Sequence, residues 1–132
     1  MVRPVPHIGP TVGYRVECDG ASVAYISDHQ APIGLDTVAD SVLDLCNGVD
    51  LLIHDAQYTE AEFSAKGHWG HCTIDYALMV AAEAGARQLC LFHHDPAHSD
   101  EVLDRELERG RAAGKRSFAN IISAWEGLTV EL

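Results

Sequence analysis

A chain of 132 residues, of which 47% are hydrophobic and 22% charged, has the size and composition of a single soluble globular domain. The formal net charge of −11 argues against binding of duplex nucleic acid through a basic face, and no apolar run is long enough to span a membrane. The first residues lack the apolar core of a secretory signal and the four cysteines form no CxxC pair, so we expect a cytoplasmic protein without a disulfide framework.

Hydrophobic periodicity and turn signals predict strands and helices in alternation. Asp19-Gly20 is a strong two-residue turn signal between alternating segments, so the chain is expected to contain an early β-hairpin. Thr37 and Thr73 can each cap a helix whose apolar residues recur at helical spacing. The predicted elements, in chain order, are strands at 11–18 and 21–27, a helix at 38–46, a strand at 49–54, a short helix from Thr59 through Phe63, a helix at 73–84, a strand at 87–94, a helix at 101–113, and a closing hairpin formed by 120–125 and 128–132.

The order of these elements predicts an α/β fold. Two strand-helix-strand crossovers require parallel pairing, whereas the hairpins require antiparallel pairing. We therefore expect one domain over residues 1–132, with a mixed β-sheet and helices layered on one face.

Titratable residues gather where the predicted strands end. In open α/β sheets the loops at the carboxyl ends of the strands converge and carry the ligand sites. Imidazole and carboxylate groups together suit zinc, iron or manganese, and no thiolate lies at these strand ends. The residues concerned are Asp28-His29, His54-Asp55 and His93-His94-Asp95.

These motifs, taken in order, resemble the second half of a metallo-β-lactamase superfamily hydrolase, nearest the ribonuclease Z and cyclic-nucleotide phosphodiesterase type. The resemblance implies half of an αββα sandwich over the whole chain. It also extends to SAWEGLTVEL, which is similar to the last hairpin of the family. The landmarks are His7 ahead of TVGYRVE, Asp28 in VAYISDH, His54-Asp55 in DLLIHDAQYT, His71 in GHCT, and His93 in LCLFHHDP.

The resemblance also implies roles for individual side chains. His7 would bind one metal ion, Asp28 would bridge two, and His93 would bind the other, with Zn²⁺, or alternatively Mn²⁺ or iron, as the ion. A carboxylate suits the bridging position because its two oxygens can serve two cations. His71 would donate a proton to the leaving oxygen, and Asp55 would orient a histidine from behind the ligands.

One family motif does not occur in this sequence. Family members carry HxHxDH in their first half, where it supplies most of the metal ligands, and no HxHxDH is found here. Half a sandwich also leaves one apolar sheet face uncovered, which is unusual in water. We therefore expect either a homodimer formed through the sheets or a partner that supplies the complementing N-terminal half.

The sequence leaves two functions open. The first is a metal-dependent hydrolase that cleaves a small-molecule or nucleotide phosphodiester with metal-activated water. The second is a catalytically incomplete half-domain that dimerises or docks onto a partner and keeps a partial metal site. Each landmark also has a simpler explanation: His93 as a polar strand end, Asp28 as a turn cap, and His7 as part of a mobile terminus.

Overall fold

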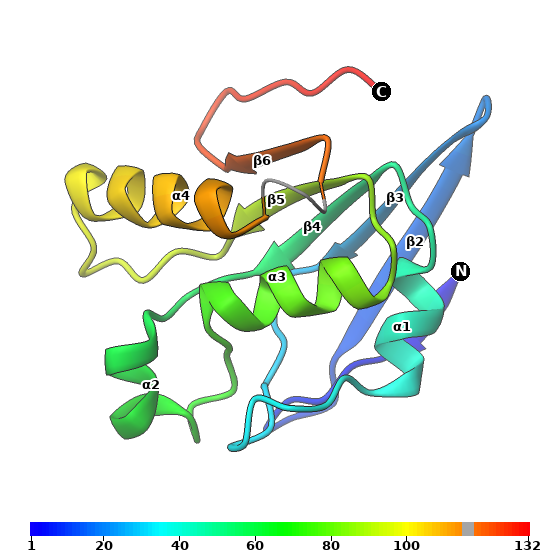
Figure 1. Ribbon diagram of the computed structural model, residues 1–132. Coiled ribbons are helices and arrows are strands. Elements are labelled where there is room, and N and C mark those ends of the chain that lie inside the picture. Colours follow the sequence, from blue (N-terminus) through cyan, green and yellow to red (C-terminus); the bar gives the residue numbers. More distant parts are fainter. Residues whose placement is uncertain (115–117) are drawn as a thin grey trace.

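One mixed sheet runs through the molecule, and its strands lie side by side in the order in which they occur along the chain (Figure 1). The computed structural model describes residues 1–114 and 118–132. Pairing is antiparallel from β1 to β3 and parallel from β3 to β6, which confirms the predicted mixed sheet. Within the described residues the strands are β1 (Val2–Pro4), β2 (Val12–Cys18), β3 (Ala21–Ile26), β4 (Leu51–Asp55), β5 (Gln88–Phe92) and β6 (Asn120–Ser123).

Helices α1, α3 and α4 pack in a row against one face of this sheet (Figure 1). Each parallel strand lies next to the previous one in the same direction across the sheet, so right-handed crossovers bring the connecting helices to the same face. The predicted layering on one face is confirmed. The helices of the described residues are α1 (Asp40–Cys46), α2 (Glu60–Lys66), α3 (Ile74–Glu83) and α4 (Asp100–Gly114).

Local signals explain where several elements begin. Asp19 and Gly20 both have positive φ angles, 51° and 87°, as a tight turn between β2 and β3 requires. The hydroxyl of Thr73 accepts a hydrogen bond from the backbone N–H of Tyr76 at 3.0 Å and caps α3 as predicted. Thr59 caps α2 with a reciprocal bond to Glu62.

The hydrophobic core lies between the sheet and the helix row. Leu45 of α1, Leu52 of β4 and Leu89 of β5 are fully buried there. Gly13 of β2 faces the same layer, because a Cβ at this position would lie 2.8 Å from the Leu45 side chain. The close packing of this core therefore restricts the motion of the strand ends that carry the titratable residues.

The opposite side of the sheet is open. Tyr14 and Tyr25, which point away from the helices, keep 46% and 37% of their surface exposed. They belong to a row of cross-strand partners that reaches all six strands, which we call the open sheet face. The row consists of Val2, Tyr14, Tyr25, Ile53, Cys90 and Ile122. Its exposed members are Val2, Tyr14 and Tyr25 on β1 to β3, whereas Cys90 on β5 is buried.

Three details of the sequence prediction are wrong in the early and middle parts of the chain. Helix α1 begins at Asp40 rather than at 38, and Ala39, not Thr37, occupies its cap position without a side-chain bond. The Thr37 carbonyl instead accepts a hydrogen bond from the Tyr76 hydroxyl at 3.0 Å, a tertiary contact that periodicity does not encode. The third correction is the number of parallel strand pairs, which is three where two crossovers were expected.

The predicted closing hairpin is also wrong. Strand β6 forms and pairs in parallel with β5, but residues 128–132 form no strand. Their alternating pattern is not sufficient, because strand formation depends on what each face packs against, and Glu131 and Leu132 are exposed. Separately, no helix within the described residues combines the length and apolar character needed to cross a bilayer.

Candidate metal centre

Five titratable side chains meet at one edge of the sheet. His7 lies in the connection between β1 and β2, Asp28 follows β3, Asp55 ends β4, and His93 follows β5. His71 comes from the loop before α3. The parallel strands β3, β4 and β5 all end at this edge, which is why residues far apart in sequence become neighbours.

Two groups of these residues have ligand atoms close enough to share a cation. In the first, His7, Asp28 and His71 each offer an atom within 4.8 Å of the others, and in the second Asp55, His71 and His93 do. Asp28 Oδ1 also lies 3.9 Å from His93 Nε2. Asp28 thus stands between His7 and His93, the two histidines predicted to bind metal. His71 belongs to both groups, so the geometry offers it a place among the ligands as well as the predicted role of proton donor.

Asp55 and His71 form a hydrogen-bonded pair at the centre of this arrangement. His71 Nδ1 donates to Asp55 Oδ2 at 2.8 Å. The Asp55 carboxylate is fully buried and also accepts backbone N–H bonds from His29 at 3.0 Å and Gln57 at 3.1 Å. Its hydrogen bond to His71 raises the pKa of that imidazole, and this gain exceeds the opposing effect of burial. His71 therefore holds a proton more readily than an imidazole without this partner, and Asp55 fixes its orientation.

Gln57 is a functional candidate that the sequence analysis missed. Its side-chain amide nitrogen Nε2 lies 3.3 Å from Nδ1 of His93, and turning the amide by 180° would bring the oxygen to the same place. A histidine that binds metal through Nε2 donates its Nδ1–H to a second residue, and the amide oxygen of Gln57 can accept that bond when it faces the ring. The position of Gln57 in the sequence could have indicated its role, because it follows the strand-end residue Asp55 by two residues.

Gly70 is a second missed residue. Its φ is +100°, and a Cβ there would lie only 2.6 Å from Nε2 of His7. Glycine is therefore required both by the backbone angle and by the close approach of the His7 ring. His7 is held from its other side, since Nδ1 accepts a hydrogen bond from the backbone N–H of Gly9 at 3.3 Å.

A second pair of histidines lies behind this edge, completely buried. His54 Nδ1 donates to the Asp55 carbonyl at 2.7 Å, and its Nε2 accepts from His29 Nδ1 at 2.9 Å. His29 Nε2 is left without a hydrogen-bond partner among the described residues. Burial, followed by the unfavourable charge of His54, lowers the pKa of His29 to about 2, and burial also lowers that of His54. This buried pair is neutral, and neither member belongs to the groups that can share a cation.

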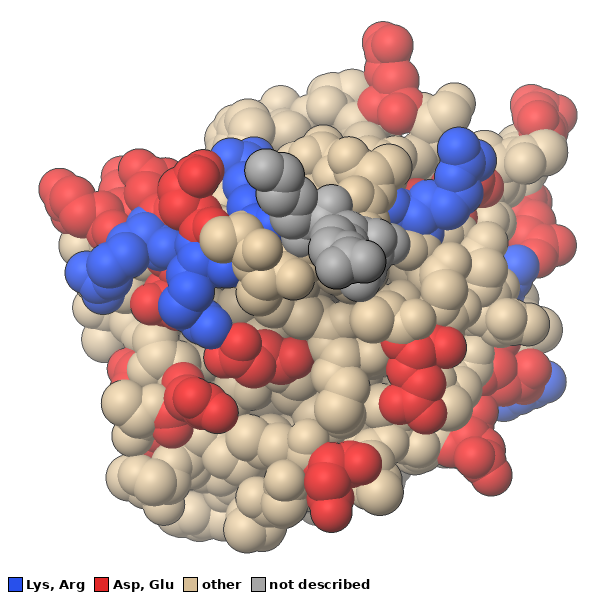
Figure 2. Space-filling model, in the orientation of Figure 1, with Lys and Arg blue, Asp and Glu red and all other residues tan. Residues whose placement is uncertain are grey.

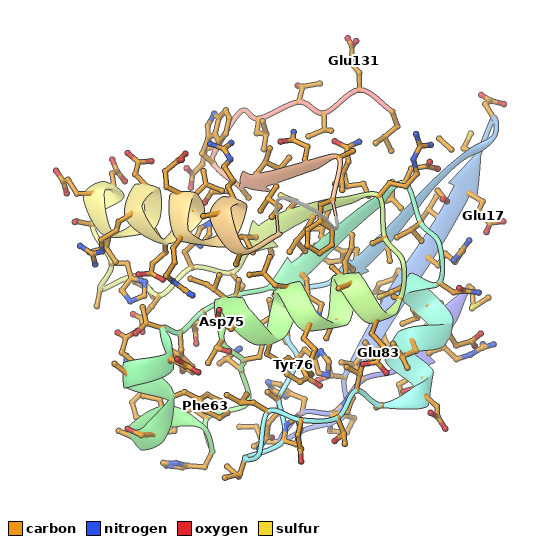
Figure 3. The ribbon with its side chains drawn as sticks, viewed as in Figure 1. Glu17, Phe63, Asp75, Tyr76, Glu83 and Glu131 are labelled. Carbon is orange, nitrogen blue, oxygen red and sulfur yellow. The ribbon has the colours of Figure 1, made fainter. Side chains whose placement is uncertain are left out.

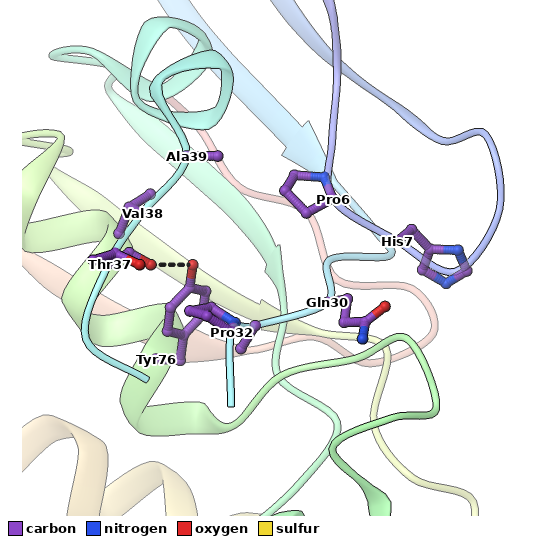
Figure 4. Close-up of a pocket in the computed structure, with 9 residues that line it drawn as sticks. Pro6, His7, Gln30, Pro32, Thr37, Val38, Ala39 and Tyr76 are labelled. Atoms are coloured by element: carbon purple, nitrogen blue, oxygen red, sulfur yellow. Dashed lines mark hydrogen bonds between the residues drawn. The ribbon is translucent and has the colours of Figure 1, made fainter. Parts of the chain in front are cut away.

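A cavity of about 420 Å³ opens next to His7 (Figure 4). Tyr76 extends from α3 toward the loop that follows β3, and its hydroxyl is fixed by the Thr37 carbonyl (Figures 3 and 4). Pro6 and Pro32 contribute apolar walls and Gln30 a polar one. The cavity is large enough for a small organic group.

Charge on the surface is mainly acidic. On the face shown in Figure 2, the lysine and arginine side chains form small groups bordered by acidic ones, without a continuous basic stripe. Several of these cations are engaged in ion pairs, such as Arg109 with Asp75 at 2.7 Å. The expectation that the chain does not bind duplex nucleic acid through a basic patch stays a prediction. The distribution of charge on this face is consistent with it.

Comparison with known proteins places the chain in a family. A family model described as "Beta-lactamase superfamily domain" matches residues 2–94. A ribonuclease Z from Synechococcus sp. (strain CC9311) is 33% identical over 130 residues, which cover 94% of this chain and 38% of that protein. The chain spans about a quarter to two fifths of the length of such curated relatives.

Solved structures share the same fold. The metallo-beta-lactamase fold protein YhfI from Bacillus subtilis superposes with a TM-score of 0.71 at 22% identity, covering 96% of this chain and 46% of that one. Zn(2+)-bound PqqB from Methylobacterium extorquens gives a TM-score of 0.70 at 18% identity, covering 99% and 49%. With its mixed sheet, one-sided helix row and matching family model, this chain belongs to the metallo-β-lactamase superfamily.

Proposed function

We propose that this chain provides one half of a metal-dependent hydrolase that cleaves phosphodiester bonds. The observation that carries the proposal is the meeting of His7, Asp28, His71 and His93 around the buried carboxylate of Asp55. Relatives named ribonuclease Z support the choice of a phosphodiester as the bond that is cleaved.

The side chains at this edge fit a metal ion of the zinc, manganese or iron class. Imidazole nitrogens and carboxylate oxygens are the donors that these ions accept, and the glycine at position 70 leaves room for His7 to approach. In the proposal His7, Asp28 and His93 hold up to two ions, with Asp28 between them. A bound ion of this kind would acidify a water molecule and offset negative charge on the phosphate.

The residues of this chain then handle the proton of the leaving group. His71 holds one nitrogen against Asp55, so its Nε2 is the nitrogen available to a substrate. The Asp55 hydrogen bond raises the pKa of His71, which favours the protonated imidazole that would donate to the departing oxygen. Asp55 acts through His71, because its carboxylate is fully buried and holds the imidazole in position.

The open sheet face requires a cover in this proposal. A complementing half that carries HxHxDH would bring the remaining ligands and bury the row that contains Tyr14 and Tyr25. A second copy of the chain would bury the row but would not supply that motif, since it is absent from the sequence. The complementing half is therefore the partner that gives an active hydrolase.

The test compares the chain alone with the chain joined to a metallo-β-lactamase N-terminal half that carries HxHxDH. We expect metal-dependent hydrolysis of bis(p-nitrophenyl) phosphate only in the joined protein. In that protein His71→Ala should lower the rate of hydrolysis by about 10²- to 10⁴-fold. His68→Ala is the matched control, because His68 lies in the same loop and is exposed. Among the described residues its side chain accepts a hydrogen bond from Trp69 and forms none with the candidate metal centre. A joined protein that binds metal, shows no turnover and buries the open sheet face would contradict the hydrolase and support the docking half-domain.

A further inference from the structure

A second cavity, of about 490 Å³, opens beside His93 and shares no lining residue with the cavity beside His7. Its walls come from three connections: the loop after β5, the first turn of α4, and the loop after β6. His93 lines this cleft and also belongs to the candidate metal centre. A substrate held with its phosphorus at that centre would therefore lie next to the cleft, because His93 belongs to both.

Trp125 gives the cleft an exposed aromatic wall. Its side chain is 62% exposed, yet its backbone is held on both sides. The N–H of Ala124 donates to the Leu91 carbonyl at 2.9 Å, and the Trp125 carbonyl accepts from the N–H of Leu128 at 3.1 Å. The first of these bonds ties the Trp125 loop to the end of β5, one residue before Phe92 and two before His93. The backbone that carries the indole is thus fixed beside the end of β5, and an exposed aromatic side chain at this place can stack on a planar ring.

The charge of the cleft indicates which part of a phosphodiester enters it. Of its carboxylates, Asp95 is neutralised by Lys66 at 2.7 Å. Asp100 and Glu126 are exposed, and neither forms an ion pair with a lysine or arginine of the described part of the chain. Two such carboxylates repel a phosphate, so the phosphate belongs at the metal end. They accept hydrogen bonds, so the cleft favours a planar group that carries N–H donors.

We propose that the cleft walled by Trp125 binds a nucleobase adjacent to the scissile phosphate, with the base stacked on the indole and its exocyclic amino group facing Asp100 and Glu126. Cytosine fits this arrangement better than uracil, because uracil has a carbonyl oxygen where cytosine has the amino group. The proposal deepens the proposed function by assigning a base-binding cleft beside the same centre, and it rests on that function for the position of the phosphate.

The test uses free nucleosides, so that it depends neither on metal nor on hydrolysis. The chain contains two tryptophans, and Trp69→Phe leaves Trp125 as the sole indole reporter. In the presence of a chelator, we expect cytidine to quench the fluorescence of this variant with saturation, and uridine to require a higher concentration. The absence of saturable quenching would overturn the proposal, and equal affinity for the two nucleosides would overturn the role of the carboxylates.

Calorimetric titration with cytidine separates stacking from general stability. Trp125→Ala should weaken binding about 5- to 150-fold, the range that corresponds to loss of one base–aromatic stack. Trp69→Ala is the matched control, since Trp69 is also an exposed tryptophan, at 54%, but does not line the cleft. Equal affinities of the two alanine variants would overturn the site. Glu126→Gln should reduce the preference for cytidine over uridine while quenching persists. Because the nucleosides contain no phosphate, a failure here leaves the hydrolase proposal standing, and a failure of hydrolysis leaves this site standing.

Discussion

His71 and His29 lie at the same edge of one sheet, and both touch Asp55, yet they are in opposite chemical states. His71 is partly exposed and donates to the Asp55 carboxylate, which raises its pKa. His29 has no exposed surface, and only its backbone N–H contacts that carboxylate, while its ring faces another imidazole. The pKa of His29 falls to about 2 in consequence.

The difference shows that burial and the hydrogen-bond partner of a histidine, and not its place in the motif, decide its chemistry, with burial as the larger cause for His29 and the Asp55 bond as the larger cause for His71. A carboxylate neighbour gives an imidazole that holds a proton, whereas burial beside a second imidazole gives one that stays neutral. The two residues also act on stability with opposite signs. The raised pKa of His71 contributes stability that is present below its ordinary value and is lost as the pH rises through the folded pKa. The lowered pKa values of the buried pair act the other way.

The largest expected effect is the loss of metal affinity in Asp28→Asn. Asp28 is the carboxylate that stands between His7 and His93, so under the proposed function its replacement would remove a ligand from each ion that it holds. We expect the affinity for Zn²⁺ to fall by more than about 100-fold, the upper end of what outer residues cause. Competition with a chromophoric chelator measures it, and Asp104→Asn on the exposed side of α4 is the control. Unchanged affinity would remove Asp28 from the centre.

Gln57→Leu should weaken Zn²⁺ binding by about 10- to 100-fold, because His93 loses the partner of its Nδ1. Gln57→Glu keeps an acceptor oxygen at the same place and should retain the affinity. Gln88→Leu, at the opposite end of β5, serves as the control for loss of a glutamine. If the leucine and glutamate variants bind equally well, Gln57 does not position His93.

His54→Leu tests the other side of the comparison, through folding and not through metal. The substitution leaves the Nδ1–H of the buried His29 without its acceptor, so the free energy of unfolding should fall by about 1–3 kcal/mol. Urea denaturation measures this change. The exposed His68→Leu should alter the same free energy by no more than about 0.5 kcal/mol, and a similar loss in both variants would argue against a structural role for the buried pair.

The last test concerns pH dependence. Between the ordinary histidine pKa of 6.5 and the value of about 2 for folded His29, the unfolded chain binds a proton at this residue that the folded chain does not. Stability should therefore decline as the pH falls below 6.5, with a slope of up to about 1.4 kcal/mol per pH unit for each such histidine. In the double variant His29→Leu/His54→Leu, the free energy of unfolding should decline less steeply between pH 6.5 and about pH 5 than in the unaltered chain. Parallel curves would mean that the pair is protonated in the folded state.

The sequence was most informative where one local rule fixes the outcome. Asp19-Gly20 predicted the turn between β2 and β3, and Thr73 predicted the start of α3. The apolar run of β5 predicted that His93 lies where a strand ends. These predictions succeeded because turn geometry, capping and strand direction are short-range properties. The alternating tail after Gly127 failed as a strand because its pairing depends on a surface elsewhere in the molecule.

Gln57 and Gly70 escaped prediction for a related reason. A glutamine two residues after a strand, or a glycine in a loop, has no distinctive pattern, and each becomes meaningful only when the fold brings His93 or His7 beside it. The predicted roles of His7, Asp28, Asp55, His71 and His93 stay predictions that the experiments above address.

The strand order of the sheet bears on how the chain is made. Each strand pairs with the one synthesised just before it, so no strand has to wait for a distant segment to leave the ribosome. Because strands are added at one edge of the sheet, the most recently added strand is the only edge strand with unpaired backbone groups at that side. The loops that converge on Asp55 are then brought together stepwise during synthesis, and the last of them, which carries Trp125, arrives at an edge that is already built.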